Sequence, residues 1–209
     1  MENAKYKTLI ITAHPASHGL THGIGKVLKE KREEGGGEVE ILDLYKTDLK
    51  QDYLVFENIR EIPDTEVKAK IREKISGANE LVFIHPLWWM TMPAILKNFL
   101  DQNLTPRFAY QYINGKRVGL LSGKTARVYI TCDGPIWAYA LMAFPFFLSW
   151  ICGTLAFCGI MVDKCHLIRN RAFQNDEERA IYLQKVKVNA NKKSMITRFI
   201  SYLVINIGI

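Results

Sequence analysis

Short apolar runs alternate along this chain with longer stretches in which apolar residues recur at helical spacing. Runs with the length and β-branched content of strands lie at residues 7–13, 38–44, 80–85, 127–131 and 160–167. Amphipathic stretches typical of helices lie at residues 21–34, 64–77, 92–102 and 176–189. This alternation predicts a parallel sheet with helices on both of its faces.

Turn residues support these boundaries. Three glycines, Gly35 to Gly37, can end the first helix, and Asp64 or Thr65 can cap the second. We expect one α/β domain over residues 1–209, with an apolar C-terminal tail at 193–209. Right-handed crossovers leave few topologies for five parallel strands, and the order 2-1-3-4-5 would be the doubly wound, flavodoxin-like arrangement that we expect. Ligands of such sheets bind beyond the carboxyl ends of the strands, so the loops after the first, third and fourth strands are the candidate site.

Composition and charge narrow the classes of protein. The 209 residues carry a formal net charge of +7, and residues 163–200 hold nine Lys and Arg against four Asp and Glu. Such a surface attracts anions, but no nucleic-acid motif occurs, and we expect no nucleic-acid partner. The four cysteines form no CxxC pair, which predicts free thiols in a reducing compartment. The N-terminus has no apolar signal core, so we expect a cytoplasmic protein.

The loop after the first strand combines hydroxyls and imidazoles with the start of a helix. Its candidate ligand-binding residues are His14, Ser17, His18, Leu20 and Thr21. Backbone N–H groups and the helix dipole make such a loop suitable for a phosphate group. A capped helix start with solvent-facing histidines is the alternative. His14, His18 and His22 are spaced by four, but no HExxH motif accompanies them, and we expect no metal.

The loops after the third and fourth strands add an aromatic surface and a polar turn. The third-strand loop contains Pro86, Leu87, Trp88, Trp89 and Met90. A flat aromatic ligand would cover these side chains, whereas the alternative is that they cap the core or a subunit interface. The fourth-strand loop contains Thr131, Asp133, Gly134, Trp137 and Tyr139, and a plain turn is its alternative. Further aromatic residues precede an Asn114-Gly115 turn, namely Phe108, Tyr110 and Tyr112. A flavin needs a phosphate loop, an aromatic surface and a polar turn at one edge.

Several runs resemble a known family: LIITAHPASHGLT, IHPLWWMTMPAILKNFLDQNLTPRFAYQY, ITCDGPIWAY and GTLAFCGI. The chain resembles the flavodoxin-like NAD(P)H:quinone oxidoreductases, a group that includes DT-diaphorase and small bacterial NAD(P)H oxidoreductases. The resemblance implies a homodimer with flavin sites at the subunit interface. It also implies a ping-pong reaction, in which NAD(P)H delivers hydride to flavin N5 and a quinone-like acceptor then takes two electrons. The long C-terminal extension of larger members is missing, which favours FMN over FAD.

Matching positions imply roles for individual residues. His14, His18, Leu20 and Thr21, with Ser17 beside them, would hold the flavin phosphate. Pro86 to Met90 would line the isoalloxazine, and Thr131, Asp133 and Gly134 would close it. Tyr110 and Tyr112 match substrate-lining tyrosines, with Phe108 and Trp137 in the same lining, and Tyr139 is the catalytic candidate. The histidine that accompanies this tyrosine in DT-diaphorase has no counterpart, and Gly19 replaces a frequent serine. We therefore expect catalysis to depend more on flavin positioning than on side-chain acid chemistry.

Two further questions stay open at this level. A flavin-binding ancillary subunit of a membrane ion-efflux system is the alternative function, and a one-electron carrier is disfavoured because a strongly acidic surface is missing.

The segment Gly134–Val162 contains 29 residues without a charge. Pro135 and Pro145 argue against a membrane-spanning helix there. We expect burial between subunits, with peripheral membrane contact, aided by residues 199–209, as the alternative.

Overall fold

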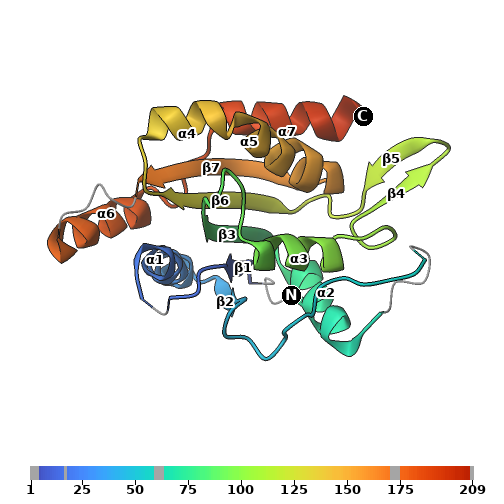
Figure 1. The fold of residues 1–209 in the computed structure, drawn as a ribbon, viewed down its shortest axis with the longest axis horizontal. Helices are drawn as coiled ribbons and strands as arrows, with labels where there is room; N and C mark the ends of the chain where they lie inside the picture. The colour runs from blue at the N-terminus through green and yellow to red at the C-terminus, as the bar shows by residue number, and fades with distance from the viewer. Residues whose placement is uncertain (1–4, 17, 59–63, 170–174, 208–209) are drawn as a thin grey trace.

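The structure is a computed structural model that describes residues 5–16, 18–58, 64–169 and 175–207. Its centre is a five-stranded parallel sheet in the order β2-β1-β3-β6-β7 (Figure 1). The strands are β1 (Lys7–Thr12), β2 (Glu38–Asp43), β3 (Glu80–Pro86), β6 (Thr125–Cys132) and β7 (Met161–Arg169). Counted within this sheet, the order is 2-1-3-4-5, which confirms the predicted doubly wound fold.

Helices cover both faces of the sheet, as its buried central strands require. Helices α1 and α6 pack against one face, where Ile10, Val82 and Tyr129 form the core. Helices α2 and α3 lie over the other face, where Leu9 and Phe83 belong to a larger core. The bounds of these helices are α1 (Leu20–Glu34), α2 (Glu66–Gly77), α3 (Ala94–Asn103) and α6 (Asp176–Val188). The four predicted helices are thus present, with ends shifted by up to two residues.

An antiparallel hairpin lies outside the main sheet. It consists of β4 (Tyr110–Ile113) and β5 (Lys116–Gly119), joined by the predicted Asn114-Gly115 turn. The hairpin is attached near the amino ends of the strands, where the Leu121 N–H donates to the Cys158 carbonyl. In Figure 1 it projects at the opposite end of the sheet from the start of α4. This position separates the hairpin from the carboxyl edge of its own chain.

The uncharged run Gly134–Val162 folds into several short helical pieces. They are α4 (Ile136–Met142), α5 (Phe144–Leu148), the π-helical η2 (Ser149–Leu155) and the 3-10 turn η3 (Ala156–Cys158). In the second half of the run, Trp150, Leu155 and Ile160 are completely buried in the core of their own chain. The first half exposes Trp137 and Leu141. Only this first half is therefore free to meet a partner, because tertiary packing already covers most of the second half.

The C-terminal tail forms a further helix, α7 (Met195–Ile207), which lies along β7 (Figure 1). The sequence pattern marks this segment as apolar but does not assign it a helix. Among the described residues, no helix has the length and apolar character needed to cross a membrane.

Candidate functional site at the carboxyl edge

The loops after β1, β3 and β6 lie next to one another because their strands are neighbours in the sheet. The Ala13 N–H, just beyond β1, donates to the Ile84 carbonyl of β3 over 3.0 Å. The Leu87 N–H, just beyond β3, donates to the Thr131 carbonyl of β6 over 2.7 Å. These bonds continue the ladders past the strand ends and hold the three loops at one edge. The sheet thus brings the predicted loops together.

The loop after β1 leads into the N-terminus of α1. Gly19 precedes the helix with φ of 126°, and no described side chain caps the first turn. The first turn also lacks an acidic residue, so its N–H groups and dipole favour an anion. Leu20 and Thr21 are buried, whereas His18 is exposed. Ser17, another predicted ligand, lies outside the described residues.

His14 connects this loop to the aromatic loop after β3. Its ring centroid lies 6.3 Å from that of Trp88 and 6.4 Å from that of His22. His22 is engaged elsewhere, because its Nε2 lies 3.0 Å from Oδ2 of Asp43 at the end of β2. The hydroxyl of Thr12 is buried nearby on β1 and has no hydrogen-bond partner among the described residues. A buried hydroxyl of this kind is an available contact for a bound polar group.

The aromatic loop is a tight turn with an unusual backbone. Trp88 and Thr91 exchange backbone hydrogen bonds of 2.9 and 3.0 Å. The two residues between them, Trp89 and Met90, have φ of 48° and 61°. A turn with two left-handed central residues normally uses Asn-Gly. Trp89 is also 97% exposed. Backbone strain and a fully exposed indole at the same position are typical of a binding site.

The loop after β6 ends in a close contact between two predicted site residues. The ring and hydroxyl of Tyr139 lie against the backbone of Gly134, where an added Cβ would collide with the ring. Thr131 is buried, Asp133 is exposed and Trp137 is 74% exposed. Glycine at position 134 therefore allows Tyr139 to fold back over the loop, which keeps the tyrosine at the carboxyl edge.

A buried pair formed by His85 and Trp150 lies behind the aromatic loop, and the sequence did not lead us to predict it. His85 is fully buried, and its Nδ1 lies 2.9 Å from the Pro86 carbonyl oxygen. The indole N–H of Trp150 donates to His85 Nε2 over 3.2 Å. Burial lowers the pKa of His85 to about 4, although the Pro86 hydrogen bond opposes this shift. The neutral imidazole thus joins the end of β3 to η2. A histidine ending the apolar run ELVFI was the available signal.

The aromatic residues of the hairpin lie elsewhere in the chain. Tyr110 packs edge-on against Phe157, with 4.9 Å between the ring centroids. Tyr112 is exposed, and Phe108 packs against the core. Tyr110 and Phe157 line a groove of about 500 Å³ that runs past Trp150 to Met92. A single chain therefore does not bring these predicted substrate-lining residues together with Trp89 and Tyr139.

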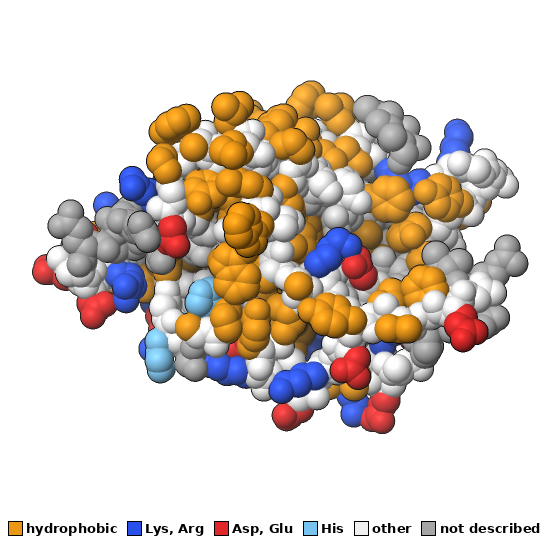
Figure 2. Space-filling view, viewed as in Figure 1, with side chains coloured by type: hydrophobic (Ala, Val, Ile, Leu, Met, Phe, Trp, Pro, Cys, Tyr) orange, Lys and Arg blue, Asp and Glu red, His pale blue; other side chains and the backbone are white. Residues whose placement is uncertain are grey.

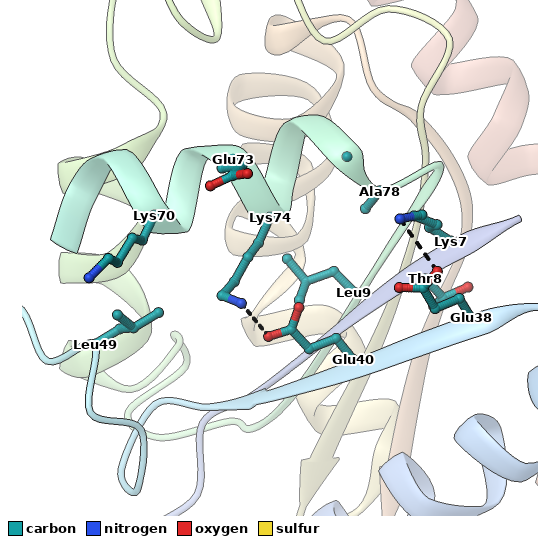
Figure 3. A pocket seen from close by; sticks show the side chains of 11 residues that line it. Lys7, Thr8, Leu9, Glu38, Glu40, Leu49, Lys70, Glu73, Lys74 and Ala78 are labelled. Atoms are coloured by element: carbon teal, nitrogen blue, oxygen red, sulfur yellow. Dashed lines mark hydrogen bonds and ion pairs between the residues drawn. The ribbon is translucent and has the colours of Figure 1, made fainter. Parts of the chain in front are cut away.

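Another cleft, of about 440 Å³, lies between α2 and the amino ends of β1 and β2 (Figure 3). Two of its lysines pair with glutamates that also line it. Lys74 lies 2.6 Å from Glu40, and Lys7 lies 3.4 Å from Glu38. Because these charges are already neutralised, the cleft offers less to a charged ligand than the carboxyl edge does.

The cysteines are free, and burial makes them poor nucleophiles. Burial raises the pKa of Cys158 to about 12 despite the opposing effect of Arg117, and it raises that of Cys165 to about 12. Cys132 lies nearest the candidate site, and burial followed by the nearby Asp133 raises its pKa as well. These thiols stay protonated near neutral pH. Within the described ranges, no three metal-type ligands lie together.

Comparisons with known proteins agree with this geometry. A family model described as "Flavodoxin-like fold" matches residues 6–190. A Haemophilus influenzae protein named "Uncharacterized NAD(P)H oxidoreductase" is 30% identical over 194 residues, which cover 87% of this chain and 96% of that protein. The Bacillus cereus "FMN-dependent NADH:quinone oxidoreductase 2" is 26% identical, covering 92% and 99%. The crystal structure of Smu.1420 from Streptococcus mutans UA159 has a TM-score of 0.72 and 30% identity, covering 92% and 99%.

Proposed function

This chain is an oxidoreductase that belongs to the family with the flavodoxin-like fold, and we propose that it uses a bound flavin to pass two electrons from NAD(P)H to a quinone-like acceptor. The turn at Trp89 and Met90 is the observation that carries this proposal. It combines two left-handed residues with an indole that is 97% exposed. The isoalloxazine ring of a flavin would cover that indole. Binding of this ring would explain why the protein has a turn with a strained backbone at this position.

The residues of the carboxyl edge fit a flavin. The uncapped first turn of α1 would receive the phosphate, with His14, His18 and Thr21 around it. Thr12 would give its unpartnered hydroxyl to the polar part of the ligand. The backbone from Pro86 to Met90 would line the ring, and Thr131, Asp133 and Gly134 would close it. FMN is favoured over FAD because the Bacillus cereus relative is named as FMN-dependent.

The chemistry divides between cofactor and protein. When bound, a flavin would supply the hydride chemistry between NAD(P)H and the acceptor. The protein's own residues position and shield it. Tyr139 has its hydroxyl beside the Gly134 backbone, where it can donate a hydrogen bond toward charge that develops during transfer. No histidine partner for Tyr139 is recognised in the sequence, so its contribution should be modest.

A homodimer would complete the site. Tyr110 and Tyr112 belong to β4 of the hairpin, which lies at the opposite end of the sheet from the carboxyl edge (Figure 1), so a second subunit would have to supply them to the site. The groove of about 500 Å³ beside α3 leads from Met92 to Tyr110 and offers an apolar surface for that contact. In a two-fold dimer each hairpin would then serve the partner's carboxyl edge.

The test of function is the cofactor itself. Purified protein should show flavin absorption, release FMN on denaturation and oxidise NAD(P)H with a soluble quinone. Tyr139→Phe should retain FMN and lower the rate by roughly tenfold or less, because its hydroxyl supplies one hydrogen bond. Protein that neither carries flavin nor binds added FMN would overturn the proposal. Flavin binding without turnover would favour the ancillary-subunit alternative.

Mixed dimers test the shared site. We expect Trp89→Ala and Tyr112→Ala each to lower activity, but a heterodimer of the two variants to regain one intact site. That site would combine Trp89 of one subunit with Tyr112 of the other. Differently tagged subunits, co-expressed and purified through both tags, allow the measurement. If the heterodimer is no more active than either variant alone, the tyrosines do not act across the interface.

A further inference from the structure

Helix α7 turns its apolar side away from the protein. Its outer face consists of exposed side chains, namely Met195, Ile196, Phe199, Tyr202 and Leu203. Its inner face contains Thr197 and Ser201, which are buried. Ile200 of this helix packs against the core, but the large exposed apolar side chains point outward, whereas the apolar stripe of an ordinary surface helix faces the core.

Polar contacts hold the helix in this orientation. Arg198 pairs with the buried carboxylate of Asp163. The Ser201 hydroxyl accepts a hydrogen bond of 3.3 Å from the Val162 N–H of β7. Arg117 of the hairpin donates to the Val204 carbonyl over 2.6 Å. Turning the apolar face inward would break the buried ion pair, so the outward face is a built feature of the fold.

The outer face needs an apolar neighbour. Several large apolar side chains on one helix form a patch of the kind that marks an interaction surface. Figure 2 shows hydrophobic side chains gathered along the upper edge, over α4 and α7. Trp137 and Leu141 of α4 are among the exposed residues. A helix of 13 residues spans about 20 Å, which is too short to cross a bilayer core of about 30 Å.

The charge of the segment that contains α7 indicates which kind of surface its outer face contacts. No acidic residue occurs anywhere in residues 179–209, whereas Lys192, Lys193 and Arg198 lie within this segment. Lys192 and Lys193 are exposed immediately before the helix, and Lys193 lies 3.8 Å from the Asp163 carboxylate, which also pairs with Arg198. Aromatic and aliphatic residues on one face, with lysines and no carboxylates at its start, match helices that lie in the interface of an anionic bilayer.

We propose that the outer face of α7 docks on the surface of an anionic lipid bilayer, with Phe199 and Leu203 entering the headgroup boundary and the positive charge of the acid-free segment 179–209 attracting the protein to the lipid. The docking does not depend on the proposed flavin chemistry. It concerns a surface that the fold presents with or without cofactor.

Vesicle sedimentation with the full-length protein tests this proposal. Binding to phosphatidylcholine vesicles that contain phosphatidylglycerol should exceed binding to pure phosphatidylcholine vesicles and should weaken with added salt. Phe199→Glu should reduce binding by roughly tenfold or more, because it removes an inserted ring and adds a negative charge. Val188→Glu is the matched control. Val188 is 69% exposed on α6, Phe199 is 62% exposed, and both lie in the acid-free segment, so the control should bind nearly as the wild type does.

Other outcomes would overturn the proposal. Equal loss in both variants would show that net charge alone attracts the vesicles. If the protein does not bind vesicles, lipid is not the partner of this face. If Phe199→Glu halves the mass measured by analytical ultracentrifugation while vesicle binding is absent, the face is a contact with a second copy of the chain. Near-ultraviolet circular dichroism of both variants ensures that each remains folded.

Discussion

Replacing Trp89 by Asn and Met90 by Gly together should stabilise the flavin-free protein by about 1–2 kcal/mol, because both positions have left-handed φ that asparagine and glycine adopt at lower cost. The same pair of changes should weaken FMN binding by roughly tenfold to a hundredfold, because an aromatic stacking surface is lost. Urea unfolding of the flavin-free protein and fluorescence titration with FMN measure the two effects. Opposite signs for stability and binding are the expected result.

The hairpin provides the matched control for this prediction. Asn114 and Gly115 have φ of 52° and 76°, close to those of Trp89 and Met90. There the chain uses the residue pair that such a turn favours. The double change Asn114→Trp and Gly115→Met should therefore lower the free energy of unfolding. The decrease should be about as large as the increase expected from the changes at 89 and 90. If the exchange at 89 and 90 destabilises the protein, the loop is not strained. If FMN binding is unchanged, the indole does not cover the flavin.

Acid should destabilise the protein through His85. Its pKa is about 4 in the folded state, because burial disfavours the charged imidazole, and about 6.5 when unfolded. Between these values the unfolded chain binds more protons, so the free energy of unfolding falls as pH decreases from 6.5 to 4. Above pH 6.5 this effect is absent. The difference of about 2.5 pKa units corresponds to about 3 kcal/mol.

A non-titrating replacement isolates this contribution. His85→Gln can still accept the hydrogen bond from the Trp150 indole, so it should remain folded and lose less stability on acidification than the wild type. Burial, assisted by Lys164, also lowers the pKa of His166 to about 4, and His166→Gln provides a second comparison. Each variant should flatten the pH profile of urea unfolding, and the double variant should flatten it further. An unchanged slope in His85→Gln would mean that the buried imidazole does not titrate as proposed.

The main sheet could be predicted because each strand and helix carries its own local signal. Apolar β-branched runs, amphipathic spacing and turn residues act within a few positions of one another. The rule for right-handed crossovers then left few possible strand orders, and the resemblance to the flavodoxin-like family indicated the one that the structure has. The same reasoning located the three loops of the site, because the carboxyl ends of neighbouring parallel strands must share an edge.

Contacts between distant segments could not be read in this way. The hydrogen bond between His85 and Trp150 joins residues 65 positions apart, and the histidine at the end of the run ELVFI does not indicate which residue it contacts. The hairpin aromatics precede β6 in sequence, yet Tyr110 packs against Phe157, away from Trp89. Sequence proximity to the site loops did not imply spatial proximity, because α3 carries the chain back to the amino end of the sheet.

Local periodicity and general rules of chain topology were enough to predict the sheet, its covering helices and the edge at which the candidate site lies. The left-handed turn at Trp89 and Met90 became visible only in the structure, because its backbone hydrogen bonds between Trp88 and Thr91 close a conformation that the local residue types disfavour. The tertiary structure also decided the orientation of α7. The ion pair between Arg198 and Asp163 turns the polar side of that helix inward, so the apolar residues that would signal burial lie on the surface instead.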